Sequence, residues 1–345
     1  MEKYGYKFSF GPWNIHEGAD PFGPPVRPTV AFGDKLAILK ELGFDAMQFH
    51  DDDAVPDLDN LSAAEIKRQA EAMKQVLDGQ GLVAEFVAPR LWEHPMTIDG
   101  AFTANDPAVR AYAIERFKKA ADIARYMGTD LTVLWLAREG TYLREAKDAV
   151  RATHQLLEAI DAILEYDSGL RIIIEPKPNE PMDLAYIPTI GHALALGMQS
   201  RDPGRMGALV ESAHAVLAGL DPADEMSFAL AFGKLWSVHL NDQNGLKFDQ
   251  DRSFGSVDLR RAFNQVRVLE ENNFQEIGMV GLDVKALRTQ PAELATKHLR
   301  NSLRVFLRLV AVVRSLDKAQ IDELRQARDY EELDWLVLDA LMGNE

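Results

Sequence analysis

Eight short apolar segments recur along the chain at fairly even intervals, and this repetition constrains the fold more than any other feature. The segments span residues 8–11, 46–50, 82–87, 131–136, 172–175, 207–211, 235–241 and 277–283. Most of them are separated by stretches with helical spacing, such as residues 64–77, 108–127 and 146–166. Strands that alternate with helices in this way predict an α/β fold, and eight repeats predict a closed (β/α)8 TIM barrel.

A doubly wound sheet is the competing architecture, but it would usually bring fewer strands and a glycine-rich phosphate loop. Neither a GxGxxG pattern nor a Walker pattern occurs in the sequence. We therefore expect a TIM-barrel catalytic domain over residues 1–315 and a C-terminal helical arm over residues 316–345. The arm mixes acidic and apolar residues, and it either lies back on its own barrel or contacts a neighbouring subunit.

Composition excludes several classes of partner and chemistry. The formal net charge is −16, which disfavours binding to nucleic acid and to anionic membrane surfaces. The chain has no cysteine, which excludes disulfides, thiolate zinc sites and cysteine nucleophiles. It has neither a signal-peptide pattern at its start nor an apolar run long enough to span a membrane. These features predict a soluble, cytoplasmic protein.

Charged and polar residues follow the apolar segments, where the catalytic groups of barrel enzymes lie. The clearest example is Glu175-Pro176-Lys177-Pro178, in which a carboxylate and an ammonium group emerge together on a stiffened turn. The other segment ends add a larger set of potential ligands: His50 to Asp53, Glu211, His214, His239, Asp249, Asp251 and Asp283. So many carboxylates at one barrel mouth would repel each other unless cations bridged them.

The potential ligands divide into two groups that share Glu211. The first would consist of Glu175, Glu211, His239 and Asp283, and the second of Glu211, His214, Asp249 and Asp251. Oxygen ligands favour Mg²⁺ or Mn²⁺, and the imidazole nitrogens add some preference for Mn²⁺ or Co²⁺. The sequence therefore predicts two divalent cations per subunit.

Several separate motifs resemble those of the xylose isomerases and occur in the same order, between residue 8 and about residue 310. They are Asp20-Pro21-Phe22-Gly23, the run from Phe49 to Asp53, the run from Asp99 to Asp106, Arg138-Glu139-Gly140, the run from Glu175 to Pro181, Glu211-Ser212-Ala213-His214, and the run from Lys247 to Asp251. The resemblance implies an aldose–ketose isomerase that converts D-xylose to D-xylulose, and D-glucose to D-fructose, by a metal-assisted hydride shift between C1 and C2.

The resemblance also implies roles for individual residues. His50 would assist opening of the sugar ring, Asp53 would fix the His50 tautomer, and Lys177 would hydrogen-bond to O1 of the substrate. Trp13, Trp92 and Trp135 would form the walls of a dry pocket. Phe22 resembles the aromatic residue that this family places in the neighbouring subunit's site, which implies a homodimer or homotetramer.

The sequence departs from the family pattern at three places. His239 stands where the family has an aspartate ligand, which should favour softer ions than Mg²⁺. After the third segment, a family threonine and phenylalanine are replaced by Ala88 and Trp92, which changes the wall of the pocket. The C-terminal arm is also shorter than in the family.

Other functions compete with xylose isomerisation. An isomerase of another aldose, or a ketose 3-epimerase, would use the same barrel. A metal-dependent nuclease is disfavoured by the acidic charge. A non-catalytic sugar-binding protein would have no need of two metal sites or of the His50–Asp53 pair.

Overall fold

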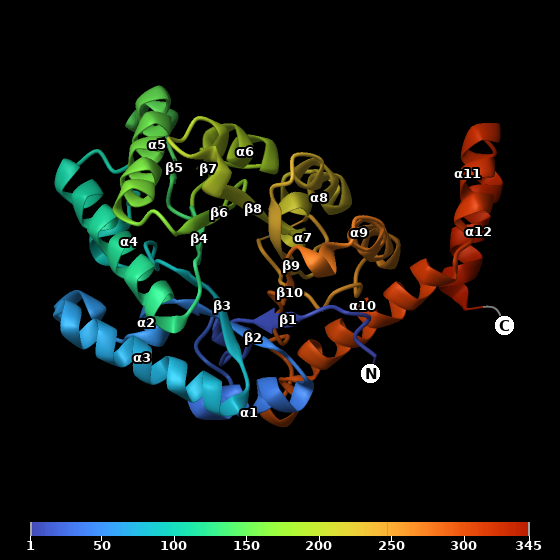
Figure 1. The fold of residues 1–345 in the computed structure, drawn as a ribbon, viewed down its shortest axis with the longest axis horizontal. Coiled ribbons are helices and arrows are strands. Elements are labelled where there is room, and N and C mark those ends of the chain that lie inside the picture. The colour runs from blue at the N-terminus through green and yellow to red at the C-terminus, as the bar shows by residue number, and fades with distance from the viewer. Residues whose placement is uncertain (1, 247, 344–345) are drawn as a thin grey trace.

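The eight apolar segments form eight parallel strands that close into a barrel, as expected for a (β/α)8 fold (Figure 1). The computed structural model describes residues 2–246 and 248–343; Lys247, the first residue of one of the motifs, lies outside this range. The order around the barrel is β1-β10-β9-β8-β6-β4-β3-β2. The strands are β1 (Phe8–Phe10), β2 (Ala46–His50), β3 (Val83–Ala88), β4 (Leu131–Trp135), β6 (Arg171–Glu175), β8 (Met206–Glu211), β9 (Leu235–Leu240) and β10 (Met279–Leu282). A separate antiparallel pair is formed by β5 (Gly140–Thr141) and β7 (Leu184–Ala185).

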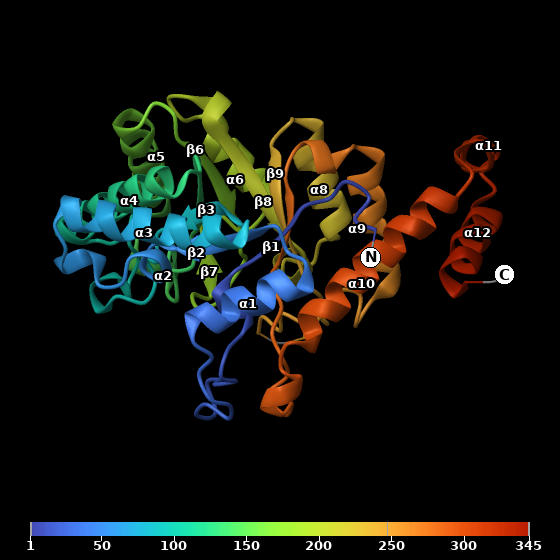
Figure 2. The ribbon, with the colours of Figure 1, turned by 60° about the horizontal axis from the view of Figure 1, so that its bottom comes forward.

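Helices surround the strands on the outside of the barrel (Figures 1 and 2). They are α1 (Phe32–Leu42), α2 (Asp51–Ala54), α3 (Ala63–Gln80), α4 (Pro107–Met127), α5 (Ala149–Tyr166), α6 (Ile190–Met198), α7 (Ser212–Leu217), α8 (Pro222–Ala231), α9 (Leu259–Glu271) and α10 (Lys297–Ser315). Two more helices, α11 (Lys318–Ala327) and α12 (Tyr330–Met342), follow beyond the barrel. No helix within residues 2–246 and 248–343 is both long enough and apolar enough to cross a membrane.

Polar side chains fix where the outer helices begin. Ser62 and Glu65 form a reciprocal capping box at the start of α3, and Asp106 accepts a hydrogen bond from the backbone nitrogen of Ala108 at 2.8 Å. Helix α5 begins at residue 149, three residues later than its periodicity suggests, because the Asp148 side chain caps it.

Alternation along the strands separates two kinds of environment, except in β3, where an irregularity in the register with β2 lets the adjacent Glu85 and Phe86 both face the barrel interior. One set of side chains packs outwards against the helices and forms the main core, as Phe8 and Phe10 of β1 do. The other set faces the barrel interior, where Phe86, Val133, Ile173 and Leu209 belong to a second apolar cluster that also contacts Trp13. Each strand can therefore present a polar residue to the interior at its carboxyl end without disturbing the helix-facing core.

The strand register brings the polar residues at these ends together. Glu211 of β8 pairs with His239 of β9, and Trp135 of β4 pairs with Glu175 of β6. All eight strands run in parallel, so these residues meet at one mouth of the barrel.

The segment after Ser315 forms two further helices, α11 and α12, that lie beyond the barrel at the far end of α10 (Figures 1 and 2). Arg260 of α9 reaches α12 through an ion pair with Asp334 at 2.8 Å. The side chain of Val337 is buried, whereas Trp335 remains 53% exposed. This helical extension thus packs against its own chain along one face only.

Candidate metal centre and substrate pocket

A pocket of about 610 Å³ opens at the carboxyl ends of the strands. All of the predicted site residues line it except Asp53 and Phe22. The lining residues from that set are Trp13, His50, Trp92, Trp135, Glu175, Lys177, Glu211, His214, His239, Asp249, Asp251 and Asp283. Five of the seven sequence motifs therefore converge on a single cavity, whereas the run from Asp99 to Asp106 and Arg138-Glu139-Gly140 do not line it and contact each other through Glu139.

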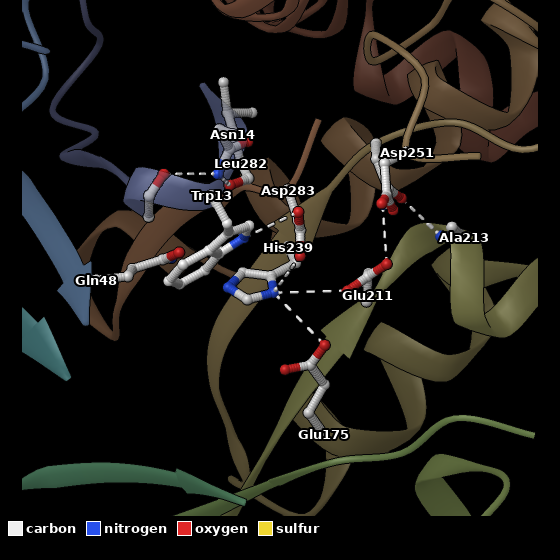
Figure 3. Close-up of polar contacts among 12 residues, drawn as sticks. Trp13, Asn14, Gln48, Glu175, Glu211, Ala213, His239, Asp251, Leu282 and Asp283 are labelled. Atoms are coloured by element: carbon white, nitrogen blue, oxygen red, sulfur yellow. Dashed lines mark hydrogen bonds and ion pairs between the residues drawn. The ribbon is translucent and has the colours of Figure 1, made fainter. Parts of the chain in front are cut away.

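His239 is at the centre of the first group of potential ligands (Figure 3). Its Nδ1 atom lies 3.6 Å from Glu175 Oε1, 3.6 Å from Glu211 Oε2 and 3.9 Å from Asp283 Oδ2. The indole nitrogen of Trp13 donates a hydrogen bond of 3.1 Å to the other oxygen of Asp283 and so fixes that carboxylate. These four potential ligands are the ones expected for the first cation.

His214 plays the corresponding part in the second group. Its Nε2 atom lies 3.2 Å from Glu211 Oε1 and 3.1 Å from Asp249 Oδ2. Asn241 donates hydrogen bonds to Glu211 at 2.9 Å and to Asp251 at 3.1 Å, and thereby links the two carboxylates. Glu211 thus lies between both groups, as the sequence predicts.

The geometry of these groups fits divalent cations. Three sets of ligand atoms each lie within 4.8 Å of one another: Glu175, Glu211 and His214; Glu211, His239 and Asp283; and Glu211, Asp249 and Asp251. Glu175 therefore faces His214 as well as His239. Carboxylate oxygens with one imidazole per group are a donor set that suits Mn²⁺, Mg²⁺ or Co²⁺.

Burial of so many like charges perturbs the ionisation of the groups. Burial raises the pKa of Glu211 and of Asp283, and it raises the pKa of Asp251 well above its ordinary value, with neighbouring carboxylates adding to each shift. Burial alone would lower the pKa of His239, but the carboxylates around this histidine hold its pKa well above the usual value. The site therefore has an excess of negative charge that bound cations would relieve.

Two lysines provide the positive charge within the cluster. Lys177 Nζ lies 3.0 Å from Asp249 Oδ2 and 3.1 Å from Glu180 Oε2, and Lys285 pairs with Asp251. Although burial opposes it, the nearby carboxylates raise the pKa of Lys177, so its ammonium group stays protonated. Lys177 can therefore act as a hydrogen-bond donor to an oxygen of a ligand in the pocket.

His50 and Asp53 form the expected pair on the opposite side of the pocket. The Nδ1 atom of His50 lies 3.1 Å from Asp53 Oδ2, and Arg90 donates to the other Asp53 oxygen at 3.1 Å. Burial works against ionisation, but the contacts with His50 and Arg90 lower the pKa of Asp53. An ionised Asp53 holds the proton on Nδ1, which leaves Nε2 of His50 as the proton acceptor.

Three tryptophans continue this wall of the pocket. The ring centroid of His50 lies 4.4 Å from that of Trp13 and 5.1 Å from that of Trp92, and Trp92 lies 4.4 Å from Trp135. Gly11 makes room for this arrangement, because a Cβ atom at residue 11 would overlap the indole ring of Trp13. The result is an aromatic wall that adjoins the charged groups, through Trp13 at Asp283 and through Trp135 at Lys177.

Phe22 lies outside this cavity. Its side chain is 83% exposed on a short loop in which Asp20 and Gly23 pair. The same loop contributes Gly18, Ala19 and Asp20 to the rim of the pocket. Phe22 therefore lies near the rim of the pocket, and its contact with a neighbouring subunit stays a prediction.

Some residues around the site have no counterpart in the sequence-based assignment. Arg90 fixes Asp52 and Asp53, and Glu180 fixes Lys177. Both follow strand ends, and position in the sequence was the only available signal for them. Lys285, which lies two residues after Asp283, forms its direct ion pair with Asp251.

Comparisons with known proteins agree with this architecture. The family model described as "Xylose isomerase-like TIM barrel" matches residues 36–304. A solved D-tagatose 3-epimerase-like protein is 16% identical with a TM-score of 0.62, over 87% of this chain and 98% of that chain. The 3-keto-D-glucoside 4-epimerase from E. coli, in its apo form, is 16% identical with a TM-score of 0.61, over 88% and 99%. A xylose isomerase domain protein from Alicyclobacillus acidocaldarius subsp. acidocaldarius is 14% identical with a TM-score of 0.59, over 89% and 99%. At these identities the likeness to solved structures concerns the fold alone.

Proposed function

The chain belongs to the xylose isomerase-like TIM barrel family, and on that premise we propose that it is an aldose–ketose isomerase that uses two divalent cations. The proposed reaction converts D-xylose to D-xylulose, and D-glucose to D-fructose, by a 1,2-hydride shift. The observation that carries the proposal is the shared carboxylate of Glu211, which lies between two groups of potential ligands. A site of this kind can polarise two adjacent oxygens of one small molecule.

The residues of the chain would act as follows. His50 would assist ring opening through Nε2, since Asp53 occupies Nδ1: it would accept the proton of the anomeric hydroxyl as the bond between that carbon and the ring oxygen breaks, and it would then pass this proton to the ring oxygen. Lys177 would donate a hydrogen bond to O1 and stabilise negative charge that develops on it. Trp13, Trp92 and Trp135 would exclude water from the reacting carbons. When bound, the cations would act as Lewis acids on the sugar hydroxyls.

A ketose 3-epimerase is the second candidate, and His239 is the observation that favours it. The wider superfamily of sugar isomerases and epimerases resembles this chain in having a histidine ligand at this place. An epimerase of that kind needs one cation and two carboxylates that flank the reacting carbon. The second group, with His214, Asp249 and Asp251, and the protonated Lys177 support the isomerase instead.

The sugars that are converted distinguish the isomerase from the 3-epimerase, and isotope transfer tests the hydride shift of the isomerase. Metal-stripped protein is supplied with Mg²⁺, Mn²⁺ or Co²⁺ and with D-xylose that carries deuterium at C2, alongside a panel of other aldoses and ketoses. An isomerase that uses a hydride shift keeps the deuterium and delivers it to C1 of the ketose. Loss of the label to solvent would contradict the hydride shift, and inactivity on every sugar with every ion would contradict the isomerase proposal altogether.

A matched pair of lysine variants tests the role of Lys177. Lys177→Met is expected to lower kcat by at least about 100-fold, because it removes a donor to charge that develops in the transition state. Lys119→Met is the control: Lys119 donates to the backbone oxygen of Leu58, outside the pocket, and its loss should leave kcat within about twofold.

We also propose that the chain forms a homodimer or a homotetramer. The exposed Phe22 at the rim of the pocket and the exposed Trp335 on α12 support this proposal. Sedimentation of wild-type protein against Phe22→Ala and Trp335→Ala would test it, with a shift to monomer expected for either variant.

A further inference from the structure

The imidazole of His239 has one nitrogen that faces the carboxylates and one that faces the barrel interior. Nδ1 faces Glu175, Glu211 and Asp283. Nε2 is buried and has no hydrogen-bond partner among the described residues. A histidine that binds a metal through Nδ1 carries its proton on Nε2, and such a buried N–H requires an acceptor.

Gln48 of β2 offers an acceptor of this kind. Its side chain is fully buried, and its amide nitrogen lies 3.1 Å from Ser9 Oγ and 3.0 Å from Glu85 Oε2. Its amide oxygen, like Nε2 of His239, is buried without a partner among the described residues. The orientation of the amide follows from its neighbours, because the NH₂ group is the part of Gln48 that can donate to the oxygen of Glu85.

Gly281 of β10 brings the two side chains together. A Cβ atom at residue 281 would overlap the amide nitrogen of Gln48 and would lie 3.0 Å from Cδ2 of His239, the carbon bonded to Nε2. Both side chains therefore occupy the space next to the same backbone atom. Figure 3 shows Gln48 directed from the β2 side towards the imidazole of His239.

Glu85 of β3 holds Gln48 in place through hydrogen bonds in the barrel interior. This buried carboxylate accepts hydrogen bonds from Gln48, from Ser9 and, at 2.8 Å, from Ser237. The hydrogen bond from the NH₂ group of Gln48 to Glu85 polarises the amide and increases the negative charge on its oxygen, which makes that oxygen a stronger acceptor. Ser9, Gln48, Glu85 and Ser237 form one hydrogen-bonded interior network beneath the first group of ligands.

We propose that Gln48 is a positioning residue for His239: its amide oxygen accepts the Nε2 hydrogen, which fixes the tautomer that leaves Nδ1 free to bind a cation. Glu85 holds Gln48 in that orientation. The inference rests on the proposed function only in that it requires a cation at the first group. It assigns a role in metal binding to two interior residues that touch neither the substrate nor the ion.

Metal affinity tests this role directly. Binding of Mn²⁺ to the metal-stripped full chain is measured by calorimetry for wild type, Gln48→Met and Glu85→Gln. Gln48→Met should weaken one of the two binding events by about 10- to 100-fold and leave the other unchanged. Glu85→Gln keeps the amide of Gln48 in place, so it should give a smaller loss at the same event. Gln265→Met is the matched control, since Gln265 is an equally buried glutamine that contacts Ser212 and the backbone of Arg261 instead.

A second measurement is made on the wild type and does not depend on Gln48→Met folding. The ¹⁵N shifts of the histidine ring nitrogens in the Mg²⁺-loaded wild type should show His239 protonated at Nε2, with its signals identified by their loss in His239→Gln. Protonation at Nδ1, or equal Mn²⁺ affinities in wild type and folded Gln48→Met, would overturn the inference.

Failure of the inference and failure of the proposed function give different results. A wild-type protein that turns over xylose while Gln48→Met binds both ions normally would refute the role of Gln48 alone. A wild-type protein that is inactive on every sugar, but whose Mn²⁺ affinity depends on Gln48, would refute the isomerase and support the role of Gln48. Absence of any ion binding would refute both.

Discussion

Replacing Glu211 by glutamine is expected to stabilise the metal-free protein and to remove most of its response to divalent cations. Glu211 is the residue common to all three ligand sets, and each set holds its ligand atoms within 4.8 Å. Two like charges about 4 Å apart repel by about 4 kcal/mol at an effective dielectric constant of 20. Four carboxylates, those of Glu175, Asp249, Asp251 and Asp283, lie within 4.8 Å of Glu211, and attraction to His214 Nε2 at 3.2 Å and to His239 Nδ1 at 3.6 Å offsets most, but not all, of their summed repulsion. A net gain of about 2 kcal/mol remains, which corresponds to a rise of roughly 3 °C in Tm for a chain of this size.

Glutamine is the appropriate replacement because it has the shape of glutamate and can still accept the hydrogen bond from Asn241. The assay is calorimetric melting of chelated protein, followed by melting in the presence of Mn²⁺. A cation at 100 times its Kd stabilises the wild type by about 2.7 kcal/mol at each site, and the variant should lose most of this gain.

Glu139→Gln provides the control for a buried carboxylate that has no ligand role. Glu139 accepts hydrogen bonds from the backbone nitrogens of Ala101, Phe102 and Thr103. Its replacement should lower the Tm of the metal-free protein, because charged acceptors are lost, while the response to Mn²⁺ stays intact. The reasoning is refuted if Glu211→Gln behaves like Glu139→Gln.

Three further predictions concern pH, the pocket wall and the backbone. Burial lowers the pKa of His298 from 6.5 to about 4, so the unfolded state binds a proton at this histidine more readily than the folded state does. The free energy of unfolding should therefore fall by up to about 3 kcal/mol as the pH drops from 6.5 to 4. Urea titrations of His298→Gln should show a flatter pH dependence than those of the wild type. Ala88→Thr adds a hydroxyl group to the pocket wall. The kcat/KM for xylose divided by that for 5-deoxyxylose should rise roughly tenfold, which is the contribution of one hydrogen bond. An unchanged ratio would show that residue 88 does not contact the sugar hydroxyls. A Cβ atom at residue 140 would overlap the backbone oxygen of Leu184, so Gly140→Ala should lower the free energy of unfolding by about 1–3 kcal/mol in urea titrations, and an unchanged midpoint would contradict the contact.

The sequence predicts the barrel well because its strands are short, largely buried runs, and several of them end in a polar residue or directly before one. Residues 172–175 illustrate this: three isoleucines followed by Glu175 form β6, and the carboxylate emerges at the barrel mouth. Because parallel strands end at one face, the convergence of Glu175, Glu211 and His239 follows from the fold class without any knowledge of distances.

Contacts made by loops were harder to predict, because they depend on how a loop folds back. Lys285 illustrates the difficulty. It lies two residues from Asp283, but its backbone nitrogen donates to Asp251 and its side chain pairs with that same residue. Likewise Asp51, in the run after the second strand, forms the first turn of α2 and is held by Arg116 of α4, 65 residues away. Neither pairing has a periodic signal in the sequence.

The polar residues of the barrel interior could not have been assigned at all from their positions within strands. Gln48, Glu85 and Ser237 lie on three different strands, and their contacts depend on the register and on the space left by Gly281. A carboxylate buried inside a barrel has a large desolvation cost that apolar packing would avoid. The proposed role of the network, which is to fix the tautomer of the ligand His239, gives a reason for that cost.

The identity of residue 239 gives a physical reason for this network. An aspartate ligand has only acceptor atoms, so it would place no donor in the barrel interior. A histidine that binds through Nδ1 introduces an Nε2–H group there, and the interior must then supply an acceptor. Gln48 has the only kind of uncharged side chain that can present an oxygen to His239 while its NH₂ group remains bound to Glu85. His239, Gln48 and Glu85 are therefore best understood as one unit, in which the exchange of a carboxylate ligand for an imidazole determines what the barrel contains beneath it.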